Sequence, residues 1–321
     1  MPALSPVPIV IVAGPTASGK SALALALAME FRGGLINADS QQVYRDLRVL
    51  TARPSDAEES RAPHRLYGVI DAAETCSVGR WREMATIEID AARADGRLPI
   101  LVGGTGLYLE ALLHGLAELP SIPAASRDAA QALHASLGGA AFRDELAKLD
   151  PEAAAKLVPG DTQRLTRAYE VAIATGRSLT EWQRRPVEAP AFHAAAIVLL
   201  PPRPALNRAL DARVERMMEE GAADEARALL ARELSPDLPA MKAVGVREIG
   251  SWLAGTTSRD AAIAAMQQAT RRYAKRQYTW FRHRLSETES LQKQVADAQF
   301  SESLLPNIFS FIRAFLLTRP V

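Results

Sequence analysis

One short segment constrains the fold more than any other: Gly14, Pro15, Thr16, Ala17, Ser18, Gly19, Lys20 and Ser21 fit the pattern G-x-x-x-x-G-K-[ST]. It lies between an apolar run, residues 9–13, that predicts a strand and the run SALALALAMEF, which predicts a helix. In this setting, backbone N–H groups and the positive end of the helix dipole surround phosphate oxygens, Lys20 adds a charge and Ser21 can bind Mg²⁺. Because both flanks match, a chance glycine-rich turn is a poor explanation. The motif predicts a bound phosphate compound without identifying it.

Three more apolar runs predict the remaining strands. Residues 35–38 end at Asp39, and residues 98–102 end in Gly-Gly-Thr-Gly before a helix near Leu107; residues 194–200 follow only after a long gap. Short strands that alternate with helices predict an α/β fold with a parallel sheet covered on both faces. Together with the motif, this is a P-loop NTPase-like core.

The long gap is expected to hold an insertion. From Pro120 to Pro190 the pattern is helical throughout, with Pro-rich segments at both edges. The length of 321 residues allows two domains or one core with a large insertion. We therefore expect an α/β core of residues 1–119 and 191–321, interrupted by a helical insertion of residues 120–190.

The overall composition excludes some classes and is silent on others. Lys and Arg total 38 against 37 Asp and Glu, so the net charge of +1 indicates neither a nucleic acid nor an acidic partner. The one cysteine, Cys76, excludes an internal disulfide framework and a Cys-based zinc site, and fits a reducing cytoplasm. No run approaches the ~18 apolar residues of a membrane helix, so no membrane association is expected. The late apolar segment 307–317 is expected to be a terminal helix that docks on the core through Ile308, Ile312, Phe315 and Leu316.

A helix near the end of the core concentrates positive charge. Residues 270–284, TRRYAKRQYTWFRHR, contain six cations, among them Arg271 and Arg276, four aromatic residues and no acid. Such a face follows phosphates, and aromatic rings either stack on bases or pack into the core. Six cations without a counter-charge favour contact with a nucleic acid over a solvated helix face. The aromatic residues themselves are expected to belong to the core.

Two charged residues admit two interpretations each. Asp39 at the end of a strand either lies in the ligand-binding edge of the sheet or caps the helix that follows it. Arg213 lies beside the apolar stripe of its helix, so its guanidinium needs an anion, which is either a bound diphosphate or an internal Asp or Glu. These residue patterns leave both questions open.

At this point the chain resembles a known family, the bacterial tRNA dimethylallyltransferases, also called tRNA isopentenyltransferases. The matching blocks run in family order from about residue 8 to residue 284 and include GPTASGKS, NADSQQVY, VGGTGLY, DTQRLTRAYEV, KAVGVRE and TRRYAKRQYTWFR. The sequence departs from the usual pattern at Leu50 and Arg53, where the family has glycine and lysine, at Ala209, where arginine is common, and at Val246, where tyrosine is usual.

The resemblance implies a reaction. A dimethylallyl group would move from dimethylallyl diphosphate to the exocyclic amine of the adenosine 3′ of the anticodon. Asp39 would be the base that takes the amine proton, Thr105 would lie near the reacting adenosine, and Arg213 would bind diphosphate. The P-loop, residues 14–21, would hold this diphosphate with Mg²⁺ on Ser21. An ordinary P-loop nucleotide hydrolase is expected to have an acid at the end of another strand, whereas residues 98–102 end in Gly-Gly-Thr; use of the P-loop for an isoprenoid diphosphate accounts for this difference.

The resemblance also implies tRNA contacts. Asp39, Ser40, Gln41, Gln42 and Thr105 would hold the target base and its neighbours. The anticodon stem-loop and anticodon loop would contact Gln163, Arg164, Leu165, Thr166, Arg167, Lys242, Gly245 and Arg247, with Arg127 as a further contact. No additional apolar face is evident, so a monomer is expected.

Other functions account for fewer of these features. A P-loop kinase of a nucleotide or small metabolite explains the motif and Asp39 but not the basic helix. A non-catalytic RNA-binding protein explains the helix but neither Asp39 nor Arg213. An adenylate isopentenyltransferase would have no use for residues 163–167 or the basic helix.

Overall fold

The computed structural model describes residues 6–117, 119–185, 192–288 and 290–318. The expected end of the insertion at Pro190 lies outside these residues, and so does residue 191, where the core is expected to resume. The described chain divides into two compact units, one formed by residues 1–113 and 191–321 and the other by residues 114–190. The division therefore falls six residues before the expected start of the insertion, where helix α4, Gly106–His114, ends.

The first unit is built on a six-stranded sheet in the order β3-β2-β4-β1-β5-β6, and every pair is parallel. Its strands are β1 Val7–Ala13, β2 Gly33–Asn37, β3 His64–Arg65, β4 Leu98–Gly103, β5 Phe192–Leu199 and β6 Leu291–Ala296. The predicted α/β class with a parallel sheet and its four strands are confirmed. The sequence missed β3, which has two residues, and β6, which is half polar.

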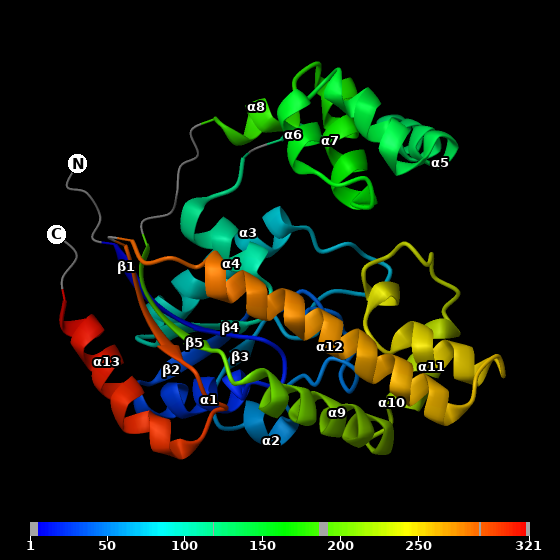
Figure 1. Ribbon diagram of the computed structural model, residues 1–321. Helices are drawn as coiled ribbons and strands as arrows, with labels where there is room; N and C mark the ends of the chain where they lie inside the picture. Colours follow the sequence, from blue (N-terminus) through cyan, green and yellow to red (C-terminus); the bar gives the residue numbers. More distant parts are fainter. Residues whose placement is uncertain (1–5, 118, 186–191, 289, 319–321) are drawn as a thin grey trace. The chain divides into compact units, whose positions relative to one another are not determined.

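Alternating side chains of β1 enter two different cores, so both faces of the sheet are covered. Ile9 and Ile11 belong to the larger core, which contains helix α3, Val78–Ala94, and α4 (Figure 1). Val10 and Val12 belong to the other, which contains α1, Lys20–Glu30, and α13, Leu305–Leu317. The remaining elements of this unit are α2 Asp56–Glu59, α9 Arg203–Glu219, α10 Ala222–Leu230, η1 Ala240–Lys242, α11 Val246–Leu253, α12 Arg259–His283 and η2 Glu302–Leu304.

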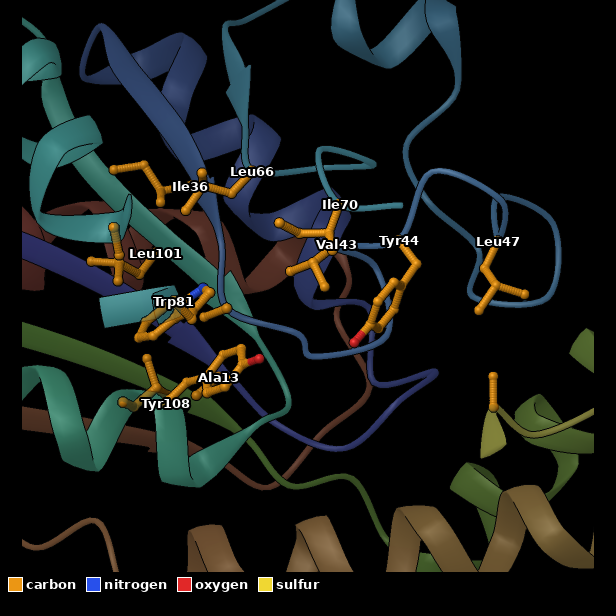
Figure 2. Close-up of a cluster of buried hydrophobic side chains, with 14 of the residues drawn as sticks. Ala13, Ile36, Val43, Tyr44, Leu47, Leu66, Ile70, Trp81, Leu101 and Tyr108 are labelled. Carbon is orange, nitrogen blue, oxygen red and sulfur yellow. The ribbon is translucent and has the colours of Figure 1, made fainter. Parts of the chain in front are cut away.

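Part of the larger core lies directly under the carboxyl ends of β1, β2 and β4. The rings of Trp81 and Tyr108 stack with centroids 4.3 Å apart, and Figure 2 shows them beside Ala13, the last residue of β1. Trp81 Nε1 donates a hydrogen bond to the Asn37 carbonyl oxygen at 2.8 Å. This packing fixes the ends of the strands that carry the candidate site.

The second unit is helical and has its own small core. It contains α5 Ala124–Ala147, α6 Pro151–Lys156, α7 Thr162–Thr175 and α8 Leu179–Gln183. Phe142 and Leu146 of α5 pack with Leu165 and Ala168 of α7. The Asp150 carboxylate accepts hydrogen bonds from the N–H and hydroxyl of Thr180, which joins α6 to α8.

The terminal helix docks on the sheet, although its buried face is narrower than predicted. Ile308, Ile312 and Phe315 are buried, and the Phe315 ring stacks on His193 of β5 with centroids 4.6 Å apart. Leu316 is 41% exposed, against expectation, because its helical angle places it at the edge of the stripe. Among the described helices, none is both long and apolar enough to cross a membrane.

The docking of α13 predicts a clear difference between two substitutions. Ile312→Ala removes a fully buried side chain and should lower the free energy of unfolding by about 2–5 kcal/mol. Leu317→Ala, at an 84% exposed position of the same helix, should change it by less than about 0.5 kcal/mol. Urea unfolding measures both, and equal effects would show that α13 does not dock in solution.

Candidate active site

The P-loop connects β1 to α1, as the motif predicts. Gly19 has a φ of 90°, a left-handed conformation that glycine adopts easily, and α1 begins at the next residue. A Cβ atom on Gly14 would lie 2.6 Å from the Leu199 carbonyl oxygen at the end of β5. The loop is therefore held closely against the sheet, at the helix N-terminus where an anion is stabilised.

The segment that follows β6 also supports this loop. The Phe300 N–H donates to the Ser18 carbonyl oxygen at 3.1 Å, and Gln299 Nε2 donates to the Ala17 carbonyl oxygen. A Cβ atom on Gly19 would lie 2.6 Å from the Phe300 Cβ. The carboxyl-terminal part of the chain is thus in direct contact with the P-loop backbone.

Two side chains of the P-loop, Ser18 and Lys20, are consistent with a bound anion. Ser18 is fully buried, and its Oγ has no hydrogen-bond partner within the described part of the chain. Burial lowers the pKa of Lys20 to about 8; the Asp39 carboxylate opposes this shift and the Arg213 guanidinium adds to it. An anion bound in the loop would favour the charged form of Lys20 again.

Ser21 lies exposed on the first turn of α1. No group of three or more His, Cys, Asp or Glu side chains suited to a metal ion occurs in the described ranges. Mg²⁺ commonly uses few protein ligands and takes others from substrate phosphates and water. The Ser21 hydroxyl beside a phosphate cradle fits such an ion.

Asp39 follows β2 and is only 8% exposed. Its Oδ1 accepts a hydrogen bond from the Gln41 N–H at 3.0 Å, and its own N–H donates to Asn37 Oδ1 at 2.9 Å. Residues 40–43 form turns, and the next helix along the chain is α2. The helix-cap interpretation is therefore wrong. The carboxylate lies near enough to Lys20 and Arg213 to affect the pKa of both.

Thr105 lies beside the Asp39 turn. Its Oγ1 accepts a hydrogen bond from the Ser40 N–H at 2.9 Å and donates to Ser40 Oγ at 3.2 Å, while its N–H donates to the Ala38 carbonyl oxygen. Tyr273 of α12 also belongs here. Burial raises the pKa of its phenol and nearby Asp39 adds to this, whereas hydrogen bonds with Thr105 and Ser40 oppose it. One aromatic residue of the basic helix thus belongs to the site, while Phe281 lies in the core.

Arg213 of α9 is half-buried, and its Nη2 donates to the Thr51 carbonyl oxygen at 3.2 Å. Burial lowers its pKa to about 10, against the opposing effect of Asp39. No Asp or Glu of the described residues forms an ion pair with it. The internal-acid interpretation is therefore not supported, and the guanidinium lies where an anion would stabilise it.

The loop that carries Thr51 is held from two sides. Gln42 Nε2 donates to the carbonyl oxygens of Thr51 and Ala52 at 2.9 and 3.0 Å. The Glu225 carboxylate of α10 accepts three backbone hydrogen bonds, from the N–H groups of Arg48, Val49 and Leu50, at 2.6–2.8 Å. Gln42 is expected to contact tRNA, but its amide nitrogen donates both of these hydrogen bonds within the protein.

The glycines at the end of β4 and directly after it allow other segments to pack closely against this turn. A Cβ atom on Gly103 would lie 2.0 Å from the Ala38 carbonyl oxygen, and one on Gly106 would lie 2.2 Å from the Trp280 ring. A Cβ on Gly104 would lie 2.0 Å from Gln277 Nε2. These glycines therefore allow β2 and α12 to approach this turn.

The basic helix α12 presents an open hollow. It is lined by Arg272, Lys275, Arg276, Thr279, Trp280, His283 and Arg284. The guanidinium of Arg276 lies 5.5 Å from the Tyr273 ring centroid. Arg271 differs because it forms an ion pair with Asp211 of α9. Among the described residues, the cations of residues 270–284 form this one ion pair, and its acid comes from the neighbouring helix α9.

Of the six candidate tRNA contacts in the insertion, three are exposed, two are half-buried and one is buried. Arg127, Gln163 and Arg164 are exposed, and Arg164 forms an ion pair with Asp161. Arg167 pairs with Glu170 at 2.6 Å, and Thr166 is half-buried, its hydroxyl donating to the Thr162 carbonyl oxygen. Leu165 is fully buried in the insertion's core, so its side chain is not available for the expected tRNA contact.

The KAVGVRE segment has exposed and buried members. Lys242 and Arg247 are exposed, and Lys242 pairs with Asp237 at 3.1 Å. Gly245 is buried with a φ of 102°, and its N–H donates to Glu248 Oε2. A Cβ there would lie 2.5 Å from a methyl carbon of Leu50. Because Gly245 has no side chain, it leaves room for Leu50. Position 50 is the one at which the family usually has glycine.

Sequence reasoning missed Gln277, Glu225 and Tyr273. Gln277 stands in the block AKRQYTWFR, but it is uncharged, so the charge pattern does not single it out. Glu225 carries no motif signal, and only its three backbone partners reveal its role. Tyr273 was assigned to the core on its residue type alone.

Comparison with known proteins gives a consistent result. The family described as IPP transferase matches residues 42–284, and the one described as isopentenyl transferase matches residues 7–75. The tRNA dimethylallyltransferase of Rhodospirillum rubrum is 53% identical over 97% of this chain and 96% of its own length. That of Paramagnetospirillum magneticum is 52% identical over 98% of both chains.

Solved structures agree with these matches. The tRNA isopentenylpyrophosphate transferase of Bacillus halodurans is 34% identical, with a TM-score of 0.68 over 97% of this chain and 96% of its own. A eukaryotic dimethylallyltransferase acting on tRNA is 26% identical, with a TM-score of 0.81 over 98% of this chain and 81% of its own. On these matches across nearly its whole length, the chain belongs to the IPP transferase family, and the curated relatives named above are tRNA dimethylallyltransferases.

Proposed function

We propose that the protein transfers a dimethylallyl group from dimethylallyl diphosphate to the exocyclic amine of the adenosine 3′ of the anticodon, and releases diphosphate. The observation that carries this proposal is the meeting of one buried carboxylate, Asp39, with two cations, Lys20 and Arg213, at a phosphate-binding loop. The relatives named above are enzymes of this kind. A kinase or a non-catalytic RNA-binding protein leaves part of this group unexplained.

Asp39 is the proposed base. The exocyclic amine is a weak nucleophile because its lone pair is delocalised into the purine ring, so removal of its proton helps the attack. The Gln41 N–H and the Asn37 side chain hold the turn that orients this carboxylate. Ser40, Gln41, Gln42 and Thr105 are proposed to hold the target base beside it.

The P-loop and Arg213 are proposed to bind the diphosphate. Departure of this group leaves an allyl-cation-like carbon and increases the negative charge on the phosphate oxygens. Positive groups that are already in place stabilise that charge as it forms. Lys20, the N-terminus of α1 and Arg213 are in place. Mg²⁺ held by Ser21 would supply further neutralisation of the diphosphate.

The tRNA is proposed to contact the exposed cations of α12, the insertion and the KAVGVRE segment. Arg276 lies in the hollow of α12, while Arg127, Arg164 and Arg247 are exposed elsewhere. A target base in a loop is easier to extrude than one in a duplex. We further propose that the protein acts as a cytoplasmic monomer.

The proposal is tested by incubating the protein with Mg²⁺, dimethylallyl diphosphate and unmodified tRNA. Nucleoside mass spectrometry should detect the addition of C5H8 to adenosine. Asp39→Asn keeps an oxygen for the Gln41 N–H but cannot take a proton, so its turnover should fall at least about 100-fold while tRNA binding persists. Modification of free AMP alone, or none at all, contradicts the proposed reaction; full activity of Asp39→Asn contradicts only the choice of base.

The pKa of Lys20 predicts a pH dependence. Lys20 is charged below about pH 8 and loses its proton above it, so kcat/KM for dimethylallyl diphosphate should be level below pH 8 and decline above it. Lys20→Arg keeps the charge at these pH values and should remove the decline, even if its overall activity is lower. A decline that persists in Lys20→Arg would have to be assigned to another group.

The cations of α12 predict a salt dependence. Arg276→Ala should weaken tRNA binding. The log of the association constant for tRNA falls linearly with the log of the salt concentration, and the steepness of this fall should decrease by about 1, since one phosphate contact is lost. Arg271→Ala is the matched control, because Asp211 already neutralises this arginine, and its slope should change less. Filter binding at several salt concentrations measures both slopes. Equal slopes for Arg276→Ala and the unaltered protein would exclude a phosphate contact.

A further inference from the structure

The Gln277 side chain joins two loops of the site. It lies on α12 and is only 6% exposed. Its amide forms hydrogen bonds with Thr16 and Gly104, which lie 261 and 173 positions earlier in the sequence. We propose that Gln277 is a positioning residue that fixes the P-loop relative to the turn carrying Thr105. This inference rests on the proposed function, because that spacing matters when a diphosphate on one loop must face a base on the other.

The two hydrogen bonds use opposite ends of the amide. Gln277 Oε1 accepts from the Thr16 N–H at 2.8 Å, and Nε2 donates to the Gly104 carbonyl oxygen at 3.0 Å. Thr16 follows β1 and Gly104 follows β4, and these neighbouring parallel strands end in register, Ala13 opposite Gly103. The amide therefore spans the carboxyl ends of two adjacent strands, where open α/β sheets bind their ligands.

The chain makes room for this contact. A Cβ atom on Gly104 would lie 2.0 Å from Gln277 Nε2, so only glycine allows the amide to reach the Gly104 carbonyl. The next residue is Thr105, whose hydroxyl bonds to the Ser40 turn beside Asp39. A shift of the Gly104 carbonyl would therefore also move Thr105 and the Ser40 turn, which are proposed to hold the target base.

The chemistry requires one donor and one acceptor on the same planar group. A primary amide supplies both, whereas methionine has a similar length and supplies neither strong donor nor strong acceptor. A carboxylate accepts only, so it keeps the Thr16 bond and repels the Gly104 carbonyl oxygen. A protonated carboxyl group has both a C=O and an O–H, and so restores the pattern.

Gln277→Met should lower kcat by about 10- to 100-fold, because a small misplacement of reacting groups has an effect of this size. The KM values for dimethylallyl diphosphate and for tRNA should each stay within about threefold. Gln268→Met is the matched control, since Gln268 lies exposed on the same helix, and it should leave kcat unchanged. All rates are measured well below the thermal midpoint of each variant.

Gln277→Glu provides a second readout, and one that remains if Gln277→Met fails to fold. Its kcat relative to the unaltered protein at the same pH should increase as the pH falls, because the protonated carboxyl group can bond both Thr16 and Gly104. The ratio removes any pH dependence that both proteins share. Circular dichroism at each pH excludes a change in the folded fraction.

Three results would overturn the inference. These are a kcat within twofold of the unaltered protein in Gln277→Met, a loss confined to either KM, and a Gln277→Glu ratio that does not depend on pH. If the unaltered protein itself does not modify tRNA, the proposed function fails and the inference with it. Activity of the unaltered protein together with normal kcat in the variants contradicts the role of Gln277 alone.

Discussion

Parallel pairing of β1, β2 and β4 is the constraint on which the rest of the site depends. Parallel strands end at the same edge of a sheet, so the P-loop, the Asp39 turn and the Thr105 turn meet although they are far apart in the sequence. The apolar side chains of β1 fill cores on both faces and hold the strands in register. Loss of register would separate the carboxylate from the phosphate cradle.

Electrostatics then gives this edge its chemical character. Burial lowers the pKa of both Lys20 and Arg213, and the nearby Asp39 carboxylate opposes both shifts. The Arg213 guanidinium lowers the pKa of Lys20 further. Two cations near one carboxylate leave an excess of positive charge in a partly dehydrated place. The proposed diphosphate would offset that imbalance. This charge distribution supports the proposal that the site binds an anionic substrate.

The sequence predicted those parts of the site that local patterns encode. The P-loop motif is recognised from its strand and helix flanks without any knowledge of distant residues. For Asp39, the apolar run before it predicted a place at the end of a strand, while its role stayed open between the ligand-binding edge and a helix cap. Interactions between distant segments were not predictable in this way. Asp211 neutralises Arg271 from another helix, and Glu225 holds a loop more than 170 residues away. The family resemblance implies tRNA contact for the whole run 163–167, but one side of a helix faces the core and Leu165 lies on that side.

The segment Gly103 to Gly106 shows how the same residue type serves two needs. Glycines after a strand suggest a phosphate loop, and in the P-loop Gly19 fulfils that expectation through its left-handed backbone. After β4, the glycines instead admit Ala38, Gln277 and Trp280 at distances that a Cβ would forbid. Two of these three neighbours lie on α12, the helix that carries the exposed Arg276. The absence of an acid at the end of β4 therefore has a structural counterpart: the space is taken by the basic helix, which brings the proposed tRNA-binding surface and the phosphate cradle onto one rigid support.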